Sequence, residues 1–159
     1  MSVDIGGMRK PYLDGKNTFD LYDLSAREPL GQFRAWFDEA SRHESIEEPN
    51  AMCLSTATLE GRPSSRMVLL KEFGDEDQGF IFYTNYESRK AQELLANPFA
   101  ALMFYWEPMK RSVRIEGAVE KVSQEKSEAY FRTRPFGSQI GAAVSRQSQV
   151  IAGKFRRRP

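Results

Sequence analysis

The feature that most constrains the fold is a succession of short apolar segments, rich in β-branched and aromatic residues, that are separated by turns. Two of them, Ala51 to Thr58 and Arg66 to Phe73, flank a Glu60-Gly61 turn, and this pattern predicts a β-hairpin. Further strands are predicted over Phe80 to Thr84, over Phe99 to Trp106 and over Val113 to Val119. Strands joined by short turns favour antiparallel pairing.

Two of these segments differ in their expected burial. The segment from Phe99 to Trp106 is strongly apolar, which predicts a buried strand. In the segment that follows, Val113 and Ile115 alternate with charged residues, which predicts a half-exposed strand.

Helices are predicted in the gaps between the strands. Pro29 suits the first turn of a helix in which Leu30, Phe33, Phe37 and Ala40 form one apolar face. The other predicted helices are Ser88 to Ala96, ending before Asn97-Pro98, one that Ser123 caps and that carries Tyr130, and Ser138 to Ser145. Short turns and intervening helices together predict a mainly β fold, an antiparallel barrel decorated by helices.

Composition limits the classes of function. The 159 residues fit one domain, and 23 basic against 22 acidic residues give a net charge of +1. This balance gives no electrostatic case for nucleic acid or an anionic membrane, and no apolar run is long enough to span one. The single Cys53 fits a reducing compartment, so the cytoplasm is the expected location. His43 has no second His or Cys nearby, so no metal site is expected.

Two segments place cations at the mouth of an apolar strand, an arrangement suited to a phosphate group. Arg66 and Lys71 bracket the run Met-Val-Leu-Leu, and the strand ending near Tyr83 leads to a helix with Arg89 and Lys90 in its first turn. Cations at this end oppose the helix dipole, so helix stabilisation explains them poorly. An anion held by the helix N–H groups and these side chains would reverse that penalty. For each cation alone, a solvated surface position is the plain alternative.

These segments, with others in the same order, resemble the pyridoxamine 5′-phosphate oxidase family from about Met8 to about Ile151. The other matching motifs are Asn50-Ala-Met-Cys, Asn97-Pro-Phe-Ala, Phe104-Tyr-Trp-Glu-Pro, Arg134-Pro, Ser138-Gln-Ile-Gly and Ser145-Arg-Gln-Ser. The resemblance implies an FMN-binding split barrel that forms a homodimer with flavin sites at the subunit interface. It also implies FMN-dependent oxidation of pyridoxamine 5′-phosphate or pyridoxine 5′-phosphate to pyridoxal 5′-phosphate, with oxygen as acceptor.

The same resemblance implies a cofactor site. Arg66, Arg89 and Lys90 match positions that bind the FMN phosphate. The residues that match flavin-lining or flavin-contacting positions are Met67, Val68, Leu69, Leu70, Tyr83, Thr84, Gln147 and Ser148. For the apolar members, core packing is the alternative interpretation. Ser112 stands where the family usually has a Gln that bonds the flavin ring, and the shorter side chain needs a bridging water to reach as far.

A substrate site is implied in the same way. The residues that match positions holding the substrate phosphate are Lys71, Tyr130, Arg134 and Ser138. Two cations, a phenol and a hydroxyl can together satisfy several phosphate oxygens. Tyr130 and Arg134 share a helix face if that helix continues, and without the resemblance an ordinary aromatic–Arg contact would be favoured. No acid–base pair is expected and no catalytic side chain is assigned, because the flavin performs the difficult step.

The expected organisation has three parts. They are a flexible N-terminal arm over 1–23, a split-barrel domain over 24–151 and a divergent basic tail over 152–159. In the arm, Arg9, Lys10 and Tyr12 resemble a segment that can fold over the active site. Family members continue with further strands, so the barrel is expected to be incomplete at the C-terminus and its activity impaired. Three interpretations of the chain remain open: a fragment, an alternative product and a truncated relative. For its function, two alternatives to the oxidase also remain open: a non-catalytic flavin- or phosphate-binding isoform that acts as a dimerisation subunit, and a flavin reductase.

Overall fold

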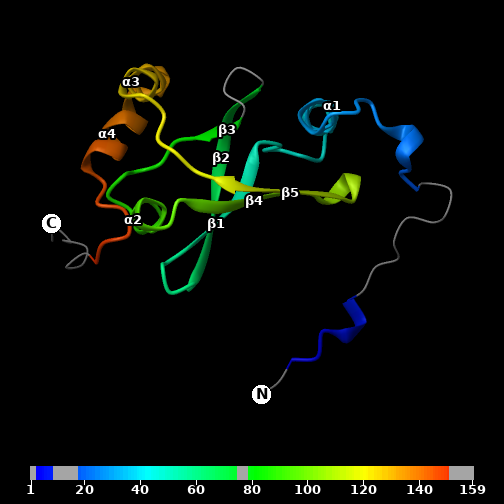
Figure 1. Cartoon of the computed structure of the whole chain (residues 1–159), viewed down its shortest axis with the longest axis horizontal. Coiled ribbons are helices and arrows are strands. Elements are labelled where there is room, and N and C mark those ends of the chain that lie inside the picture. Colours follow the sequence, from blue (N-terminus) through cyan, green and yellow to red (C-terminus); the bar gives the residue numbers. More distant parts are fainter. Residues whose placement is uncertain (1–2, 9–17, 75–78, 151–159) are drawn as a thin grey trace, which may run out of the picture.

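The protein is built around one antiparallel sheet, seen here in a computed structural model that describes residues 3–8, 18–74 and 79–150. The strands are β1 (Ala51–Ala57), β2 (Pro63–Gly74), β3 (Gly79–Phe82), β4 (Phe99–Trp106) and β5 (Arg111–Ala118), in the order β3-β2-β1-β4-β5. The α-helices are α1 (Pro29–Ser41), α2 (Arg89–Ala96), α3 (Gln124–Thr133) and α4 (Phe136–Val144). α2, α3 and α4 group at one end of the sheet and α1 lies at the other (Figure 1).

Strands β1 and β2 form the predicted hairpin. Gly61, in the turn between them, has a φ of +78°, a left-handed conformation that glycine adopts without a steric penalty. The register places Leu54 opposite Arg66 and Thr56 opposite Ser64. β2 begins earlier than predicted, at Pro63, because the cross-strand pairing continues to the end of β1.

The prediction that β4 is a buried strand is wrong for one of its faces. Phe104 is fully buried and Trp106 is 2% exposed, but Phe99, Met103 and Tyr105 are 62%, 47% and 63% exposed. Alternate side chains of a strand point to opposite faces of a sheet, and the described chain covers only one face. β5 shows the predicted alternation, with Val113 and Ile115 partly buried against the core.

Local capping explains where the helices begin. The Ser88 hydroxyl accepts a hydrogen bond from the Ala91 N–H at the start of α2, and Ser123 caps α3 in the same way, as predicted. α4 begins at Phe136, before the predicted Ser138, because the carbonyl of the preceding proline already accepts the Ser138 N–H at 2.8 Å. Two 3₁₀ turns, η1 (Gly6–Met8) and η2 (Leu21–Asp23), precede α1, and η3 (Glu107–Met109) joins β4 to β5.

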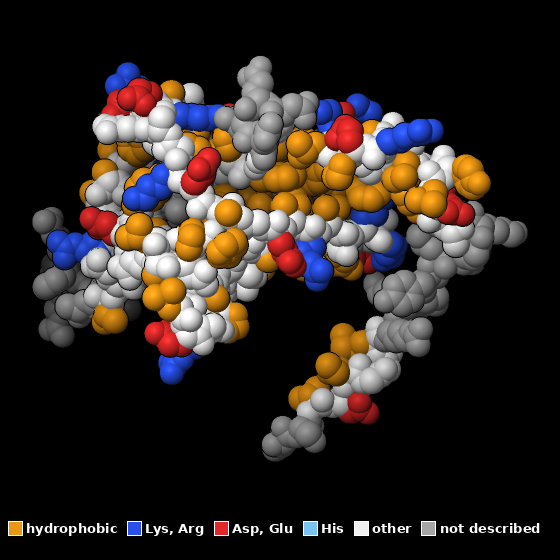
Figure 2. All heavy atoms as spheres, viewed as in Figure 1, with side chains coloured by type: hydrophobic (Ala, Val, Ile, Leu, Met, Phe, Trp, Pro, Cys, Tyr) orange, Lys and Arg blue, Asp and Glu red, His pale blue; other side chains and the backbone are white. Residues whose placement is uncertain are grey.

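The hydrophobic core lies where α1 packs on the sheet. Phe33 of α1 is 4% exposed, and its ring centroid lies 4.9 Å from that of Phe73, 5.0 Å from Phe80 and 5.2 Å from Phe104. The buried members of the cluster are Phe33, Ala40, Met52, Leu54, Leu70, Leu102, Phe104 and Trp106. Beyond α1 the covering is thinner, and a band of apolar side chains is visible between α1 and α3 (Figure 2).

Parts of the expected organisation lie outside the described residues. These include Arg9, Lys10 and Tyr12 of the N-terminal arm and the basic tail after Val150. The boundary expected at residue 24 stays a prediction, although Phe19, on its N-terminal side, contacts Trp36 edge-on at 5.4 Å. None of the helices within the described ranges has the length and apolar character needed to cross a membrane.

The packing of Phe33 predicts a large loss of stability on truncation. We expect Phe33→Ala to lower the free energy of unfolding by about 3–5 kcal/mol, because it removes the ring around which the other aromatic side chains pack. Leu59→Ala, at a residue that is 74% exposed in the hairpin turn, should change it by no more than about 0.5 kcal/mol. Urea denaturation of both variants tests this, and equal effects would contradict the assigned core.

Candidate functional site

A groove between the sheet and helices α2, α3 and α4 collects nearly all the predicted site residues. It is lined by Arg66, Met67, Val68, Leu69, Lys71, Tyr83, Thr84, Arg89, Lys90, Tyr130, Arg134, Ser138, Gln147 and Ser148. Its volume of about 2740 Å³ exceeds the roughly 300–1,000 Å³ typical of a small-molecule site. The described part of the chain therefore forms the walls of this groove without enclosing it.

Two predicted residues, Leu70 and Ser112, do not line the groove. Leu70 is 3% exposed in the core, and its backbone N–H and carbonyl bond to Asn50 at 2.8 and 3.0 Å. Ser112 is exposed on β5, opposite Tyr105 of β4. Both assignments to the cofactor came from the family resemblance, and this chain alone does not bring either side chain to the groove.

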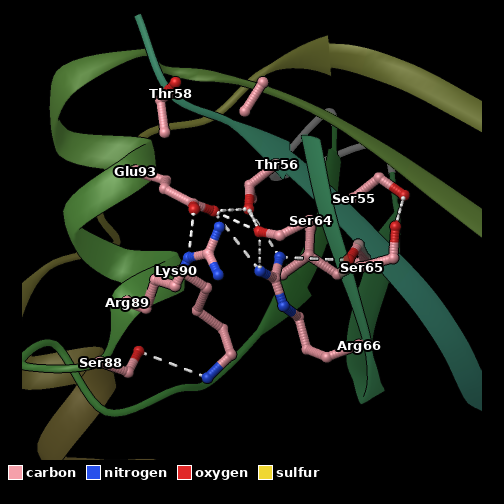
Figure 3. A network of polar contacts seen from close by, with 12 residues as sticks. Ser55, Thr56, Thr58, Ser64, Ser65, Arg66, Ser88, Arg89, Lys90 and Glu93 are labelled. Carbon is pink, nitrogen blue, oxygen red and sulfur yellow. Dashed lines mark hydrogen bonds and ion pairs between the residues drawn. The ribbon is translucent and has the colours of Figure 1, made fainter. Parts of the chain in front are cut away.

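The three cations predicted to bind the FMN phosphate converge at one end of the groove (Figure 3). Arg66 enters from β2, while Arg89 and Lys90 occupy the first turn of α2. The Arg66 guanidinium donates hydrogen bonds to the Thr56 hydroxyl at 2.6 Å and the Ser64 hydroxyl at 2.5 Å. Its side chain is 20% exposed, so its direction is set by these bonds more than by solvent.

Between the two arginines lies Glu93 of α2, which the sequence analysis did not single out. Its carboxylate accepts hydrogen bonds from Thr56 at 2.5 Å, Ser64 at 2.6 Å and Arg89 at 2.7 Å, and lies 3.4 Å from Arg66. The spacing of four residues between Arg89 and Glu93 was the available signal. This pair also corrects the argument from the helix dipole, because Arg89 has a partner on its own helix.

The surroundings of Glu93 keep its carboxylate ionised. Burial by itself would raise the pKa, since the residue is only 6% exposed. Hydrogen bonds from Ser64, Thr56 and Arg89, together with the charge of Arg89, outweigh burial and lower the pKa of Glu93 to about 2.

Lys90 connects the cation cluster to the segment after α4. It is 7% exposed, and its ammonium donates to the Gln147 side-chain oxygen at 2.7 Å and to the Ser88 hydroxyl at 3.3 Å. Burial, and then the charge of Arg66, lower the pKa of Lys90, so a nearby anion would favour its charged form. Ser148, which follows Gln147 in the chain, has a φ of +66°, a conformation that few non-glycine residues adopt.

This donor set fits the terminal phosphate of FMN. Three cations and one carboxylate leave two positive charges, and a phosphate monoester carries about −1.5 to −2 at neutral pH. The start of α2 adds backbone N–H groups and the positive end of the helix dipole. Farther along, the groove is lined by apolar and aromatic side chains such as Val68 and Tyr83, which suit a planar ring system.

The residues predicted to hold the substrate phosphate come from three elements: Lys71 lies on β2, Tyr130 on α3 with Arg134 at its C-cap, and Ser138 near the start of α4. The rings of Tyr83 and Tyr130 stack with centroids 3.8 Å apart and planes within 4°, and the Lys71 ammonium lies 5.8 Å from the Tyr130 ring. α3 ends at Thr133, so Tyr130 and Arg134 do not share a face of a continuing helix. Arg134 is instead extended at the C-cap of α3, and still lines the groove.

No group of three or more His, Cys, Asp or Glu side chains that could hold a metal ion occurs in the ranges that the structure covers.

Comparison with known proteins identifies the family. Residues 38–156 match the model of the family described as pyridoxamine 5′-phosphate oxidase. A pyridoxine-5′-phosphate oxidase from Bos taurus is 54% identical over 94% of this chain, and a pyridoxine/pyridoxamine 5′-phosphate oxidase from Bombyx mori is 53% identical over 97%. The chain spans 57% and 59% of the lengths of these two relatives.

Solved structures agree with the fold. PhzG from Burkholderia lata 383, in complex with tetrahydrophenazine-1-carboxylic acid, has a TM-score of 0.78 and 28% identity over 86% of this chain and 66% of its own. A pyridoxamine 5′-phosphate oxidase-related, FMN binding protein from Nostoc punctiforme PCC 73102 has a TM-score of 0.58 and 18% identity over 69% of this chain and 62% of its own. The curled sheet with its helices is thus the predicted split barrel. The chain belongs to the pyridoxamine 5′-phosphate oxidase family.

The low pKa of Glu93 predicts an acid-dependent loss of stability. A carboxyl whose pKa falls from 4.5 to about 2 on folding stabilises the native state fully above about pH 4.5. This stabilisation is lost as the pH falls from 4.5 towards 2, because the unfolded chain takes up the proton first. We expect Glu93→Gln to show a shallower decline of unfolding free energy over that range than the wild type.

A matched control is Glu39→Gln, which removes an exposed carboxylate paired with Arg111 outside the groove. This variant should keep the wild-type decline. Denaturation curves at several pH values between 2 and 5 measure the slopes, and identical slopes for wild type and Glu93→Gln would contradict the assignment.

Proposed function

We propose that this chain forms the cofactor- and substrate-binding body of an FMN-dependent oxidase that converts pyridoxamine 5′-phosphate or pyridoxine 5′-phosphate to pyridoxal 5′-phosphate. The observation that carries the proposal is that two sets of cationic and hydroxyl-bearing side chains, each suited to a phosphate, line one groove. One is the cluster of Arg66, Arg89 and Lys90, and the other surrounds Tyr130 and Arg134. The names of the relatives at about half identity support the same reaction.

The first group would bind the FMN phosphate. Arg66 and Arg89 offer planar guanidinium groups that can each donate two parallel hydrogen bonds to phosphate oxygens, and Lys90 adds a point charge. Gln147 already contacts Lys90 at 2.7 Å, so the segment after α4 lies close to a ligand bound there. When bound, FMN supplies the acceptor for a hydride from the substrate, and oxygen reoxidises it.

The second group would hold the phosphate of the substrate. Lys71 and Arg134 supply charge, while Tyr130 and Ser138 supply hydroxyl groups. The stack of Tyr83 against Tyr130 restricts the Tyr130 ring, so its hydroxyl is presented in a fixed direction. The protein's contribution is to hold the reacting carbon of the substrate against the flavin, because hydride transfer requires the two reacting atoms to be close and aligned.

We also propose that the chain is a homodimer. The exposed face of the sheet carries Met67, Phe99, Met103 and Tyr105, each at least 47% exposed, and contiguous apolar patches of this kind mark interaction surfaces. The open groove gives a second argument, since a partner chain could supply the missing wall. Ser112, on the same face as Tyr105, would then lie at the interface.

For location we propose the cytoplasm. The support is the single thiol, Cys53, which fits a reducing compartment.

The substrate site predicts a preference for phosphorylated amines. With FMN added, pyridoxamine 5′-phosphate should bind more tightly than pyridoxamine, and Arg134→Ala should weaken its binding by about 2 kcal/mol, the range for a lost charge-assisted contact. Changes in flavin absorbance measure binding, and aldehyde formed under air measures turnover. The control is Arg132→Ala, which removes a solvent-exposed cation in the last turn of α3. Equal affinity for both amines would contradict the proposed site.

The dimer proposal predicts an effect of charge on the exposed sheet face. Met103→Asp should yield monomers, because it places a carboxylate in an apolar interface, whereas Leu59→Asp in the hairpin turn should leave the dimer intact. If the cofactor site is shared between subunits, FMN should also strengthen the wild-type dimer by mass action. Sedimentation velocity with and without FMN measures both effects, and a folded wild-type monomer in both conditions would refute the proposal.

A further inference from the structure

The buried carboxylate of Glu93 lies among cations that are proposed to bind an anion, where simple electrostatics would place no negative charge. We propose that Glu93 is a positioning residue, which fixes the guanidinium groups of Arg66 and Arg89 in the orientation that receives the FMN phosphate. This inference rests on the proposed FMN site and adds to it a residue that the family resemblance did not assign.

The connection from Glu93 to Arg66 runs through two hydroxyl groups. Thr56 and Ser64 lie opposite each other on β1 and β2, and each hydroxyl is within 2.6 Å of both the Glu93 carboxylate and the Arg66 guanidinium. A hydroxyl has one proton to donate, and the guanidinium can only donate. Each hydroxyl therefore donates to Glu93 and accepts from Arg66, so the carboxylate sets the direction of both hydroxyls (Figure 3).

The connection from Glu93 to Arg89 is direct. The Arg89 Nε donates to one carboxylate oxygen at 2.7 Å, while the hydroxyls and Arg66 meet the other oxygen. Arg89 has a side chain that is 60% exposed, so without this bond it would sample many rotamers. A guanidinium carries five N–H donors, so the bond through Nε leaves Arg89 with further donors that can reach a phosphate.

Two physical effects predict opposite results when Glu93 is neutralised. Removing a negative charge from a phosphate site should strengthen binding if Coulomb attraction dominates. Removing the group that orients two arginines should weaken binding if prior orientation dominates. The network favours the second effect, because the carboxylate oxygens are engaged by four separate donors and the residue is 6% exposed.

The experiment compares FMN with riboflavin, which has the same ring system and no phosphate. Both ligands are titrated into the full chain and followed by flavin fluorescence, for wild type, Glu93→Gln and the double variant Thr56→Val with Ser64→Ala. Glu39→Gln, in which a carboxylate paired with Arg111 is lost outside the groove, is the control. Circular dichroism confirms folding, and the double variant tests the same network if Glu93→Gln does not fold.

We expect Glu93→Gln and the double variant to weaken FMN binding by about tenfold, equal to about 1.4 kcal/mol, while riboflavin binding stays unchanged. A merely structural role would weaken both ligands together and would overturn the inference, as would unchanged or tighter FMN binding. Failure of the wild type to prefer FMN over riboflavin would instead overturn the proposed FMN site, and this inference with it.

Discussion

The register of the β1–β2 hairpin is the constraint on which the rest of the structure depends. It gives each strand a face that changes character along its length. On β1 this face runs from Met52 and Leu54 to Thr56, and on β2 it runs from Leu70 back to Arg66 and Ser64. The apolar ends meet α1 in the core, and the polar ends meet α2. A slip of one residue would move Arg66 to the opposite face of the sheet and separate it from Glu93.

The polar end of this face holds together a cluster of charged side chains through one set of contacts. Three cations packed together would repel one another, and burial adds a cost for Lys90. Glu93 offsets the repulsion between Arg66 and Arg89, since its carboxylate contacts both, and it also accepts hydrogen bonds from the hydroxyls of Thr56 and Ser64. With Lys90, the cluster retains an excess of positive charge. A site arranged in this way does not need to reorganise when an anion arrives, which favours tight binding.

The sequence predicted what depends on local signals. The hairpin, the serine caps of α2 and α3 and the apolar face of α1 all follow from nearby residues, and the family motifs indicated most of the residues that line the groove. The role of Glu93 could not be predicted, because its partners Thr56 and Ser64 come from strands far away in the chain. The exposed face of β4 was missed because an apolar run does not reveal whether one or both of its faces are covered by the same chain.

The exposed face of β4 and the open groove have a common explanation in the topology. A five-stranded sheet with β3 and β5 at its edges curls without closing, so one face is buried by α1 while the other keeps Phe99, Met103 and Tyr105 in solvent. The same lack of closure leaves the groove wider than a small ligand requires. A partner that packs on the exposed face of the sheet would bury apolar area and would narrow the groove at the same time. Cofactor binding and assembly would then be linked, because each stabilises the arrangement that the other needs.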